Sequence, residues 1–237
     1  MTFVIDRLSK SFGEHKVLDG AQFRFESGLI YGLLGRNGAG KTTLFNCISG
    51  DMRADSGNCY WDDGAQRPLA SDEIGYVPST PAVPEFLTGR EFLKFLIDIH
   101  PERMGSALSV DDYFDMVGIA PASRDDLLKN YSHGMKNKVQ MMVNLMFKPR
   151  LLLLDEPLTS LDVVASEEMK ALLRAHKSEA VTIISTHILD LALDMCDRIV
   201  LLSHGMLEPV DKSDLDDEAF KHKIIDALRE AEDAQNA

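Results

Sequence analysis

The sequence predicts an α/β fold with a mostly parallel sheet, an N-terminal antiparallel β subdomain and an inserted α-helical subdomain. Residues 3–34 are predicted to form strands, because apolar residues alternate or run together between turn residues. Helical periodicity then dominates residues 80–147. Beyond this insert, apolar runs alternate with helical segments, and such a β-α-β-α-β order is typical of a parallel sheet covered on both faces.

In chain order, TFVIDRL and AQFRFESGLIYGLLG predict strands, and a helix is expected to start at about Lys41. GNCYWDD and EIGYVP predict two more short strands. LTGREFLKFLIDIH opens the helical insert, which continues with breaks to about Phe147. RLLLLDEP, AVTIIST and RIVLLSH are then predicted strands, and ASEEMKALLRAH and ILDLALDMC are predicted helices. We expect one domain over residues 1–210 and an acidic, helical tail over residues 211–237.

Composition limits the class of protein. The chain has 237 residues, of which 45% are hydrophobic, enough to bury a sizeable core. Its formal net charge of −13 argues against a nucleic-acid partner, which would require a basic surface. Three cysteines without paired short spacing indicate free thiols in a reducing compartment. We see no signal peptide and no segment long and apolar enough to span a membrane, so any spanning helices are expected from another chain.

The segment GRNGAGKT matches the phosphate-loop pattern G-x-x-x-x-G-K-[ST] in full. Predicted strand and helix flank it, as that motif requires. Its glycines allow backbone N–H groups to surround a phosphate at the N-terminus of the helix. Lys41 is expected to reach the β- and γ-phosphates, and the Thr42 hydroxyl to bind Mg²⁺. The motif therefore predicts a P-loop NTPase core; the alternative is a glycine-rich turn with a chance lysine. The predicted nucleotide-binding residues here are Gly35, Arg36, Asn37, Gly38, Ala39, Gly40, Lys41, Thr42 and Thr43.

A second motif, LLLLDE, places Asp155 and Glu156 at the end of a buried strand. Ligands of open α/β sheets bind at the carboxyl ends of the strands. We expect Asp155 to hold Mg²⁺ and Glu156 to polarise the water that attacks the γ-phosphate. An exposed acidic turn is the alternative interpretation.

The ordered motifs GRNGAGKT, YSHGM, LLLLDEP, SLD and STH resemble those of the ATP-binding subunits of ABC transporters, over nearly the whole chain to about residue 210. Many nucleotide enzymes share the first and third motifs, whereas YSHGM close before the acidic strand singles out this family. GLIYGLLGRNGAGKTTL and LTGREFL are most similar to the subgroup that powers exporters of drugs, antibiotics or other hydrophobic or polymeric cargo. The resemblance implies an ATPase that uses ATP and Mg²⁺.

The resemblance also implies roles for single positions. Phe12 matches the aromatic residue that stacks on adenine, with a core aromatic as the alternative. His187 matches the histidine that contacts the γ-phosphate and the water-positioning glutamate, with a structural role as the alternative. Asp162 matches a loop that crosses a dimer interface; it also suits a helix N-cap, and the two roles are compatible.

Family members work as two such domains packed head to tail, in a homodimer or a heterodimer. Ser132, His133 and Gly134 match the segment that contacts the ATP of the second domain. The other implied partner is a membrane-spanning permease, which would hold the subunit on the inner, cytoplasmic face of the cell membrane. PEFLTGREFLKFL, with Phe86 and Leu87, is our candidate docking segment; the alternative is that these are core residues of the insert.

Two positions depart from the family pattern. Ser79 stands where the family usually has a glutamine that touches Mg²⁺ and the attacking water, and serine reaches there only through a bridging water. His133 replaces a glycine, and its side chain must point away if the backbone approaches a phosphate. These departures keep open a weakly hydrolysing regulatory module. A soluble ABC ATPase of DNA repair or translation is the other alternative, although we see no long coiled-coil insert or second ATPase half.

Overall fold

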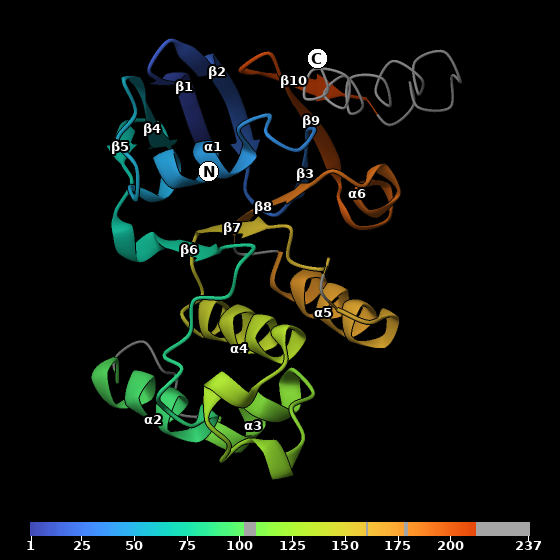
Figure 1. Cartoon of the computed structure of the whole chain (residues 1–237). Helices are drawn as coiled ribbons and strands as arrows, with labels where there is room; N and C mark the ends of the chain where they lie inside the picture. The colour runs from blue at the N-terminus through green and yellow to red at the C-terminus, as the bar shows by residue number, and fades with distance from the viewer. Residues whose placement is uncertain (102–107, 160, 178–179, 212–237) are drawn as a thin grey trace.

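The computed structural model describes residues 1–101, 108–159, 161–177 and 180–211. Two sheets and a group of helices make up this part of the chain (Figure 1). The predicted helix of the acidic tail lies outside the described residues.

The first sheet is antiparallel and has four strands in the order β2-β1-β4-β5. The long hairpin of β1 (Thr2–Phe12) and β2 (His15–Glu26) pairs through β1 with β4 (Ser56–Asp62), which in turn pairs with β5 (Gln66–Pro68). This confirms the predicted N-terminal antiparallel subdomain. The three-residue strand β5 was not predicted, because QRP is a short polar segment that carries no strand pattern.

The second sheet has six strands in the order β10-β9-β3-β8-β7-β6. Its strands β3, β6, β7, β8 and β9 are parallel, and β10 joins at the edge antiparallel to β9. The bounds of the strands are Ile30–Leu34 for β3, Ile74–Val77 for β6, Leu151–Asp155 for β7, Val181–Thr186 for β8, Arg198–Ser203 for β9 and Met206–Val210 for β10. The predicted parallel core is confirmed, whereas β10 was missed.

Alternate residues of β7 show how this sheet is covered. Leu151 and Leu153 belong to the core that contains α1 (Lys41–Ser49) and the antiparallel sheet, through Leu44, Phe45 and Ile48 of α1. Leu152 and Leu154 face the other side, in a core with α4 (His133–Met146), α5 (Val163–His176) and α6 (Leu189–Met195). The strand is therefore buried on both faces, which explains its unbroken apolar run.

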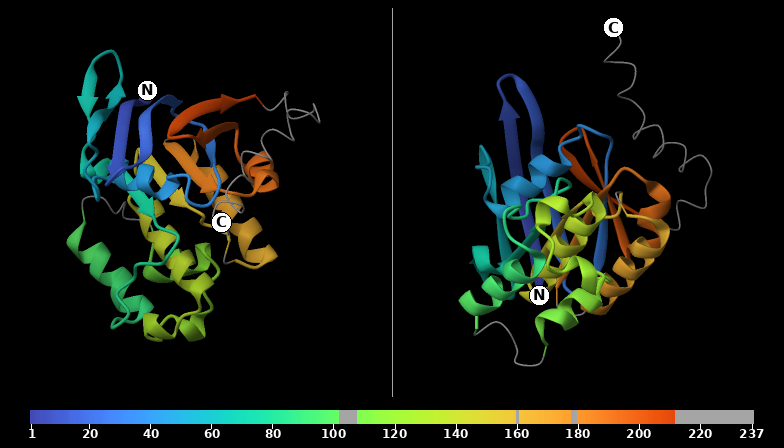
Figure 2. Two further views of the ribbon diagram at one scale, coloured as in Figure 1. Left: turned by 45° about the horizontal axis from the view of Figure 1, so that its top comes forward. Right: turned by 60° about the horizontal axis from the view of Figure 1, so that its bottom comes forward.

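The helical insert comprises α2 (Gly89–Ile99), α3 (Val110–Met116) and α4, with short 3-10 turns at Pro121–Ser123 and Leu128–Asn130; another 3-10 turn, Ser71–Glu73, precedes β6. The insert lies at the opposite end of the molecule from the antiparallel sheet (Figure 1; Figure 2, left). This confirms the inserted α-helical subdomain, although the exact domain boundaries stay predictions.

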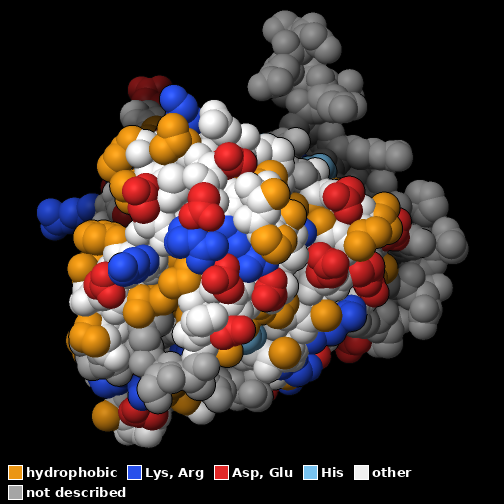
Figure 3. Space-filling view, turned by 90° about the horizontal axis from the view of Figure 1, so that it is seen from below, with side chains coloured by type: hydrophobic (Ala, Val, Ile, Leu, Met, Phe, Trp, Pro, Cys, Tyr) orange, Lys and Arg blue, Asp and Glu red, His pale blue; other side chains and the backbone are white. Residues whose placement is uncertain are grey.

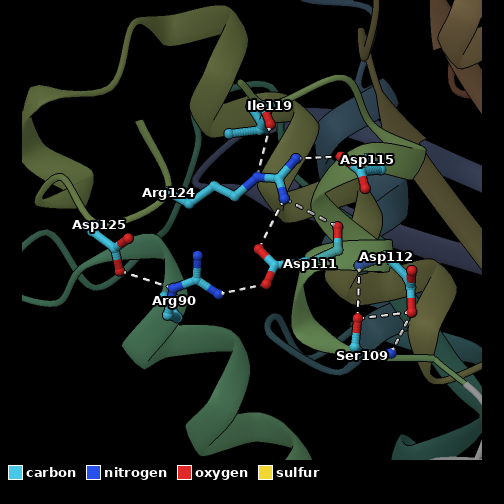
Figure 4. Close-up of polar contacts among 8 residues, drawn as sticks. All are labelled: Arg90, Ser109, Asp111, Asp112, Asp115, Ile119, Arg124 and Asp125. Atoms are coloured by element: carbon cyan, nitrogen blue, oxygen red, sulfur yellow. Dashed lines mark hydrogen bonds and ion pairs between the residues drawn. The ribbon is translucent and has the colours of Figure 1, made fainter. Parts of the chain in front are cut away.

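Ion pairs join the elements of the insert (Figure 4). Arg124 is only 4% exposed; it donates to the carbonyl of Ile119 and pairs with Asp111 and Asp115 of α3. Arg90 of α2 bridges Asp111, at 3.0 Å, and Asp125, at 2.9 Å. The two arginines therefore connect α2, α3 and the segment that follows α3. This network was not predicted from the sequence.

Candidate functional site

The carboxyl ends of four neighbouring strands meet at one edge of the six-stranded sheet. Asp155, at the end of β7, lies opposite Ser185 of β8, and Leu34, at the end of β3, lies opposite Thr186. β6 pairs with β7 in the same direction and leads into Ser79. A cleft of about 480 Å³ opens at this edge; it is lined by His15, Val17, Asn37, Gly38, Gly40, Lys41, Thr42, Thr43, Ser79, Asp155 and Glu156. The phosphate loop, the end of the LLLLDE motif and Ser79 are thus brought into one site.

The phosphate loop turns between β3 and α1, and it needs glycine at position 40. Gly40 has φ +101, and a Cβ there would lie 2.6 Å from the Cγ1 atom of Val17. The same glycine is the N-cap of α1, with no side-chain hydrogen bond to the first-turn N–H groups. These N–H groups and the positive end of the helix dipole are therefore available to an anion in the cleft.

Lys41 is buried at the base of this loop. Its Nζ atom donates to the carbonyls of Gly35, at 2.7 Å, and Arg36, at 3.1 Å, and it lies 3.9 Å from Oε1 of Glu156. Burial lowers the pKa of Lys41, and the carboxylates of Glu156 and Asp155 oppose that shift. A desolvated ammonium in a cleft built from glycines and helix N–H groups fits a phosphate chain.

Asp155 and Thr42 bring a carboxylate and a hydroxyl together in the cleft. The Thr42 hydroxyl donates to Oδ2 of Asp155 at 2.6 Å, and Asp155 is only 2% exposed. Within the described ranges, no group of three or more His, Cys, Asp or Glu side chains is placed to hold a metal ion. One carboxylate and one hydroxyl fit Mg²⁺, which is commonly bound by one or two carboxylates together with phosphate oxygens of a substrate.

Ser185 completes this group and was not predicted as a site residue. Its hydroxyl donates to the other carboxylate oxygen of Asp155, and its carbonyl and hydroxyl both accept from the backbone N–H of Glu156. Ser185 therefore holds both acidic residues from the neighbouring strand. The STH motif contained it, but its role depends on the register between β7 and β8.

Glu156 has a left-handed backbone, with φ +49, at the point where the chain leaves β7. Such a conformation is uncommon for a residue other than glycine and is retained where the surrounding structure enforces it. The Oε1 atom of Glu156 lies 2.9 Å from Nδ1 of His187. The structure thus brings together the two residues that the sequence assigned to the attacking water and the γ-phosphate.

Phe12 lies at the end of β1, is 49% exposed and has the Lys10 ammonium 5.6 Å from its ring centroid. It pairs in register with His15, which lines the cleft. The alternative that Phe12 is a core aromatic is therefore wrong, and its stacking on adenine stays a prediction.

The other predicted ligand residues lie at two helix starts. Ser132 caps α4 by accepting from the N–H of Met135 at 3.2 Å, and His133, the first residue of α4, is exposed without a positive φ. Asp162 caps α5 by accepting from the N–H of Ala165 at 2.9 Å. Neither these residues nor Gly134 line the cleft of their own chain. The predicted N-cap role of Asp162 is observed, and the contacts with a second domain stay predictions.

Comparison with known proteins gives a consistent result. Residues 18–159 match the family model described as ABC transporter. The chain is 30% identical to a probable sulfate/thiosulfate import ATP-binding protein, CysA, of Chlorella vulgaris, with 87% of this chain and 89% of that protein covered. It is 31% identical to the linearmycin resistance ATP-binding protein LnrL of Bacillus subtilis, with 89% of this chain and 69% of that protein covered.

Solved structures share the fold. An ATP-binding subunit of an ABC transporter superposes with a TM-score of 0.79 at 24% identity, covering 97% of this chain and all of that one. The ATP-binding cassette MJ0796, solved as a dimer in a post-hydrolysis state bound to ADP and Pi, gives a TM-score of 0.72 at 21% identity, covering 87% of this chain and 96% of that one. None of the helices in the described part of the chain has the length and apolarity that a membrane crossing requires. The chain belongs to the ABC transporter family, as an ATP-binding subunit with the ATPase domain of that family.

Proposed function

We propose that this subunit hydrolyses Mg²⁺-ATP in the cleft at the sheet edge and thereby powers a membrane exporter. The observation that carries the proposal is the convergence of Lys41, Thr42, Asp155, Glu156 and His187 on this edge, because each supplies a group that phosphoryl transfer needs.

Each residue has a distinct task in this proposal. The phosphate loop and Lys41 bind and orient the phosphates. Thr42 and Asp155 hold Mg²⁺, which neutralises phosphate charge when it is bound. Glu156 accepts a hydrogen bond from the attacking water and takes up its proton, and His187 holds the Glu156 carboxylate in place.

A second ATP-binding domain is proposed to complete the site from the opposite side. Ser132, His133 and Asp162 are exposed or capping residues outside their own cleft, as expected for groups that face another chain. Val163 and Val164, directly after Asp162, are 80% and 68% exposed at the start of α5. Exposed apolar residues beside a predicted interface loop support a protein contact there.

The helical insert is the proposed docking surface for a permease, which would hold the subunit at the inner face of the cell membrane. Apolar side chains surround a central charged group on this side of the molecule (Figure 3). Phe86 is 78% exposed, and Phe95, Ile99 and Leu108 are also exposed, whereas Leu87 is partly buried. Phe86 is therefore the stronger of the two predicted docking residues.

Export is the direction we propose, on the similarity of the phosphate-loop and LTGREFL segments to exporter subunits. The relatives include a linearmycin resistance protein and a sulfate/thiosulfate import protein, so the proposed direction rests on these two segments and not on membership of the family.

Affinity purification of the tagged chain from membranes in mild detergent tests the transport function. We expect a polytopic membrane protein to be recovered with the wild-type chain, and less of it with Phe86→Ser, because that change removes an exposed apolar contact without touching the cleft. The exposed apolar residue Met206 of β10 lies outside the insert, so Met206→Ser is the control and should leave the recovery unchanged. Recovery of ribosomes or DNA in place of a membrane protein would contradict the proposal.

A further inference from the structure

We propose that Gln140 of α4 is a positioning residue that holds Ser79 at the cleft. Gln140 is only 6% exposed. Its Oε1 atom accepts from the backbone N–H of Ala82 at 2.6 Å, and its Nε2 atom donates to the carbonyl of Pro78 at 3.3 Å. One side-chain amide thus connects the residues on both sides of Ser79. The inference rests on the proposed function, because it concerns the loop that brings Ser79 to the phosphates and Mg²⁺.

The segment that carries Ser79 has few other ways to be held. Residues 78–84 form neither helix nor strand. Pro78, Pro81 and Pro84 carry no N–H group, so they remove three of the seven backbone donors in this segment. Both hydrogen bonds of Gln140 are partly buried, and its amide side chain satisfies one backbone donor and one backbone acceptor at once. Gln140 therefore holds Pro78 and Ala82 in place, and their positions set the position of Ser79 between them.

Two further residues on the same face of α4 extend this attachment. Lys136, one turn before Gln140, pairs with Glu85 at 2.5 Å. Asn144, one turn after it, donates to the carbonyl of Gln140 at 2.9 Å, and its Oδ1 atom lies 3.0 Å from the place of a Cβ at Gly75. Residues four apart lie on one helix face, so one face of α4 contacts the chain from β6 to Glu85.

The same helix begins at Ser132 and His133, which are proposed to contact the nucleotide of the second domain. Gln140 follows Ser132 by eight residues, or roughly 12 Å of helix. A rigid element of this length links the Ser79 segment of one nucleotide site to the segment that faces the other. Gln140 is thereby placed to transmit a shift of α4 to Ser79.

Two variants separate the two hydrogen bonds, and a third serves as their control. Gln140→Leu removes both bonds, whereas Gln140→Glu keeps the acceptor for Ala82 and loses the donor to Pro78. We expect Gln140→Leu to lower kcat on the order of tenfold and Gln140→Glu to lower it less, with the KM for ATP little changed. Val139→Ala is the matched control, because it removes a buried apolar contact of α4 and leaves both hydrogen bonds of Gln140 in place, and it should leave kcat unchanged.

Two measurements distinguish positioning from a general loss of structure. In a Ser79→Ala background, Gln140→Leu should lower kcat by no more than about twofold, because the group that it positions is already absent. Without nucleotide, hydrogen exchange at Ala82 should be roughly tenfold faster in Gln140→Leu than in Val139→Ala. Equal and additive effects on kcat in both backgrounds, or unchanged exchange at Ala82, would overturn the proposal.

The exchange measurement also separates this inference from the proposed function. A wild-type chain that fails to hydrolyse ATP would contradict the proposed function. Faster exchange at Ala82 in Gln140→Leu would still support the attachment of the loop to α4, and unchanged exchange would reject it.

Discussion

Glu156 illustrates how single residues in this protein depend on partners from other strands. Its backbone N–H donates to the carbonyl and the hydroxyl of Ser185, in the neighbouring strand β8. Its carboxylate lies beside His187, which directly follows β8. The motif LLLLDE was enough to predict the residue, because the motif is local. The residues that orient it follow from sheet register, which the sequence of one strand does not specify.

His133 is the residue whose structural setting most changes its interpretation. It is the first residue of α4, exposed and helical, so its replacement of a glycine requires no unusual backbone. The effect of the imidazole must then lie in the space that it fills in front of a helix N-terminus.

We predict that His133→Gly raises the ATPase rate of the assembled dimer roughly two- to fivefold, because the helix N-terminus then approaches the phosphates of the second domain more closely. Steady-state ATPase measurements test this. Nucleotide affinity of the isolated monomer, measured by calorimetry, should not change. A loss of monomer binding would show instead that His133 acts on its own nucleotide or in folding.

At the scale of elements, the pattern of apolar residues predicted the long strands and helices well. β7 and β8 are buried on both faces and appear as apolar runs, and α4 and α5 carry helical periodicity. The weak elements were missed for physical reasons. β5 has three mostly polar residues, and β10 contains Pro209, which is tolerated at the edge of a sheet but lowers the strand signal.

Buried polar contacts between elements were also beyond prediction. Arg124 and Gln140 are polar residues in segments that the sequence marked as helical, and nothing local distinguishes them from exposed polar residues. Their partners lie 13 and 58 positions away, at Asp111 and Ala82. Only the folded structure shows that these two side chains join distant segments.

The arginine network gives a prediction about the insert. Arg124→Met should lower the Tm by roughly 5 °C at pH 7, because it breaks the pairs with Asp111 and Asp115 and leaves the carbonyl of Ile119 without this donor. Differential scanning calorimetry measures this. Exposed Lys94→Met of α2 is the control and should not change the Tm.

The Tm difference between wild type and Arg124→Met should depend on pH through Asp111. Hydrogen bonds from Arg90 and then Arg124 hold the pKa of Asp111 below its ordinary value of 3.8. The stabilisation is therefore complete above pH 3.8 and is lost as the pH falls through the lowered pKa of the folded state. The Tm difference between wild type and Arg124→Met should be constant from pH 5 to 8 and narrow below about pH 4. A difference that grows at acid pH would contradict this account.

At the scale of the whole molecule, the six-stranded sheet gathers the nucleotide-binding groups at one edge, and the helical insert projects away from the antiparallel sheet (Figure 1). The cleft holds one half of the proposed site, while Ser132 and Asp162 lie outside it. A chain that binds ATP in its own cleft would thus present Ser132 and Asp162 to the ATP of a second copy. ATP shared between two chains stabilises their closed dimer by mass action.

Light scattering of Glu156→Gln with Mg²⁺-ATP tests this central claim most directly. The amide keeps the size of the side chain but cannot take up a proton, so turnover should fall at least about a hundredfold while ATP stays bound. Lys41→Ala, which removes the ammonium bound to Gly35 and Arg36, is the control and should remain monomeric. We predict that Glu156→Gln doubles in mass when Mg²⁺-ATP is added; a monomer at saturating ATP, or hydrolysis at the wild-type rate, would contradict the account.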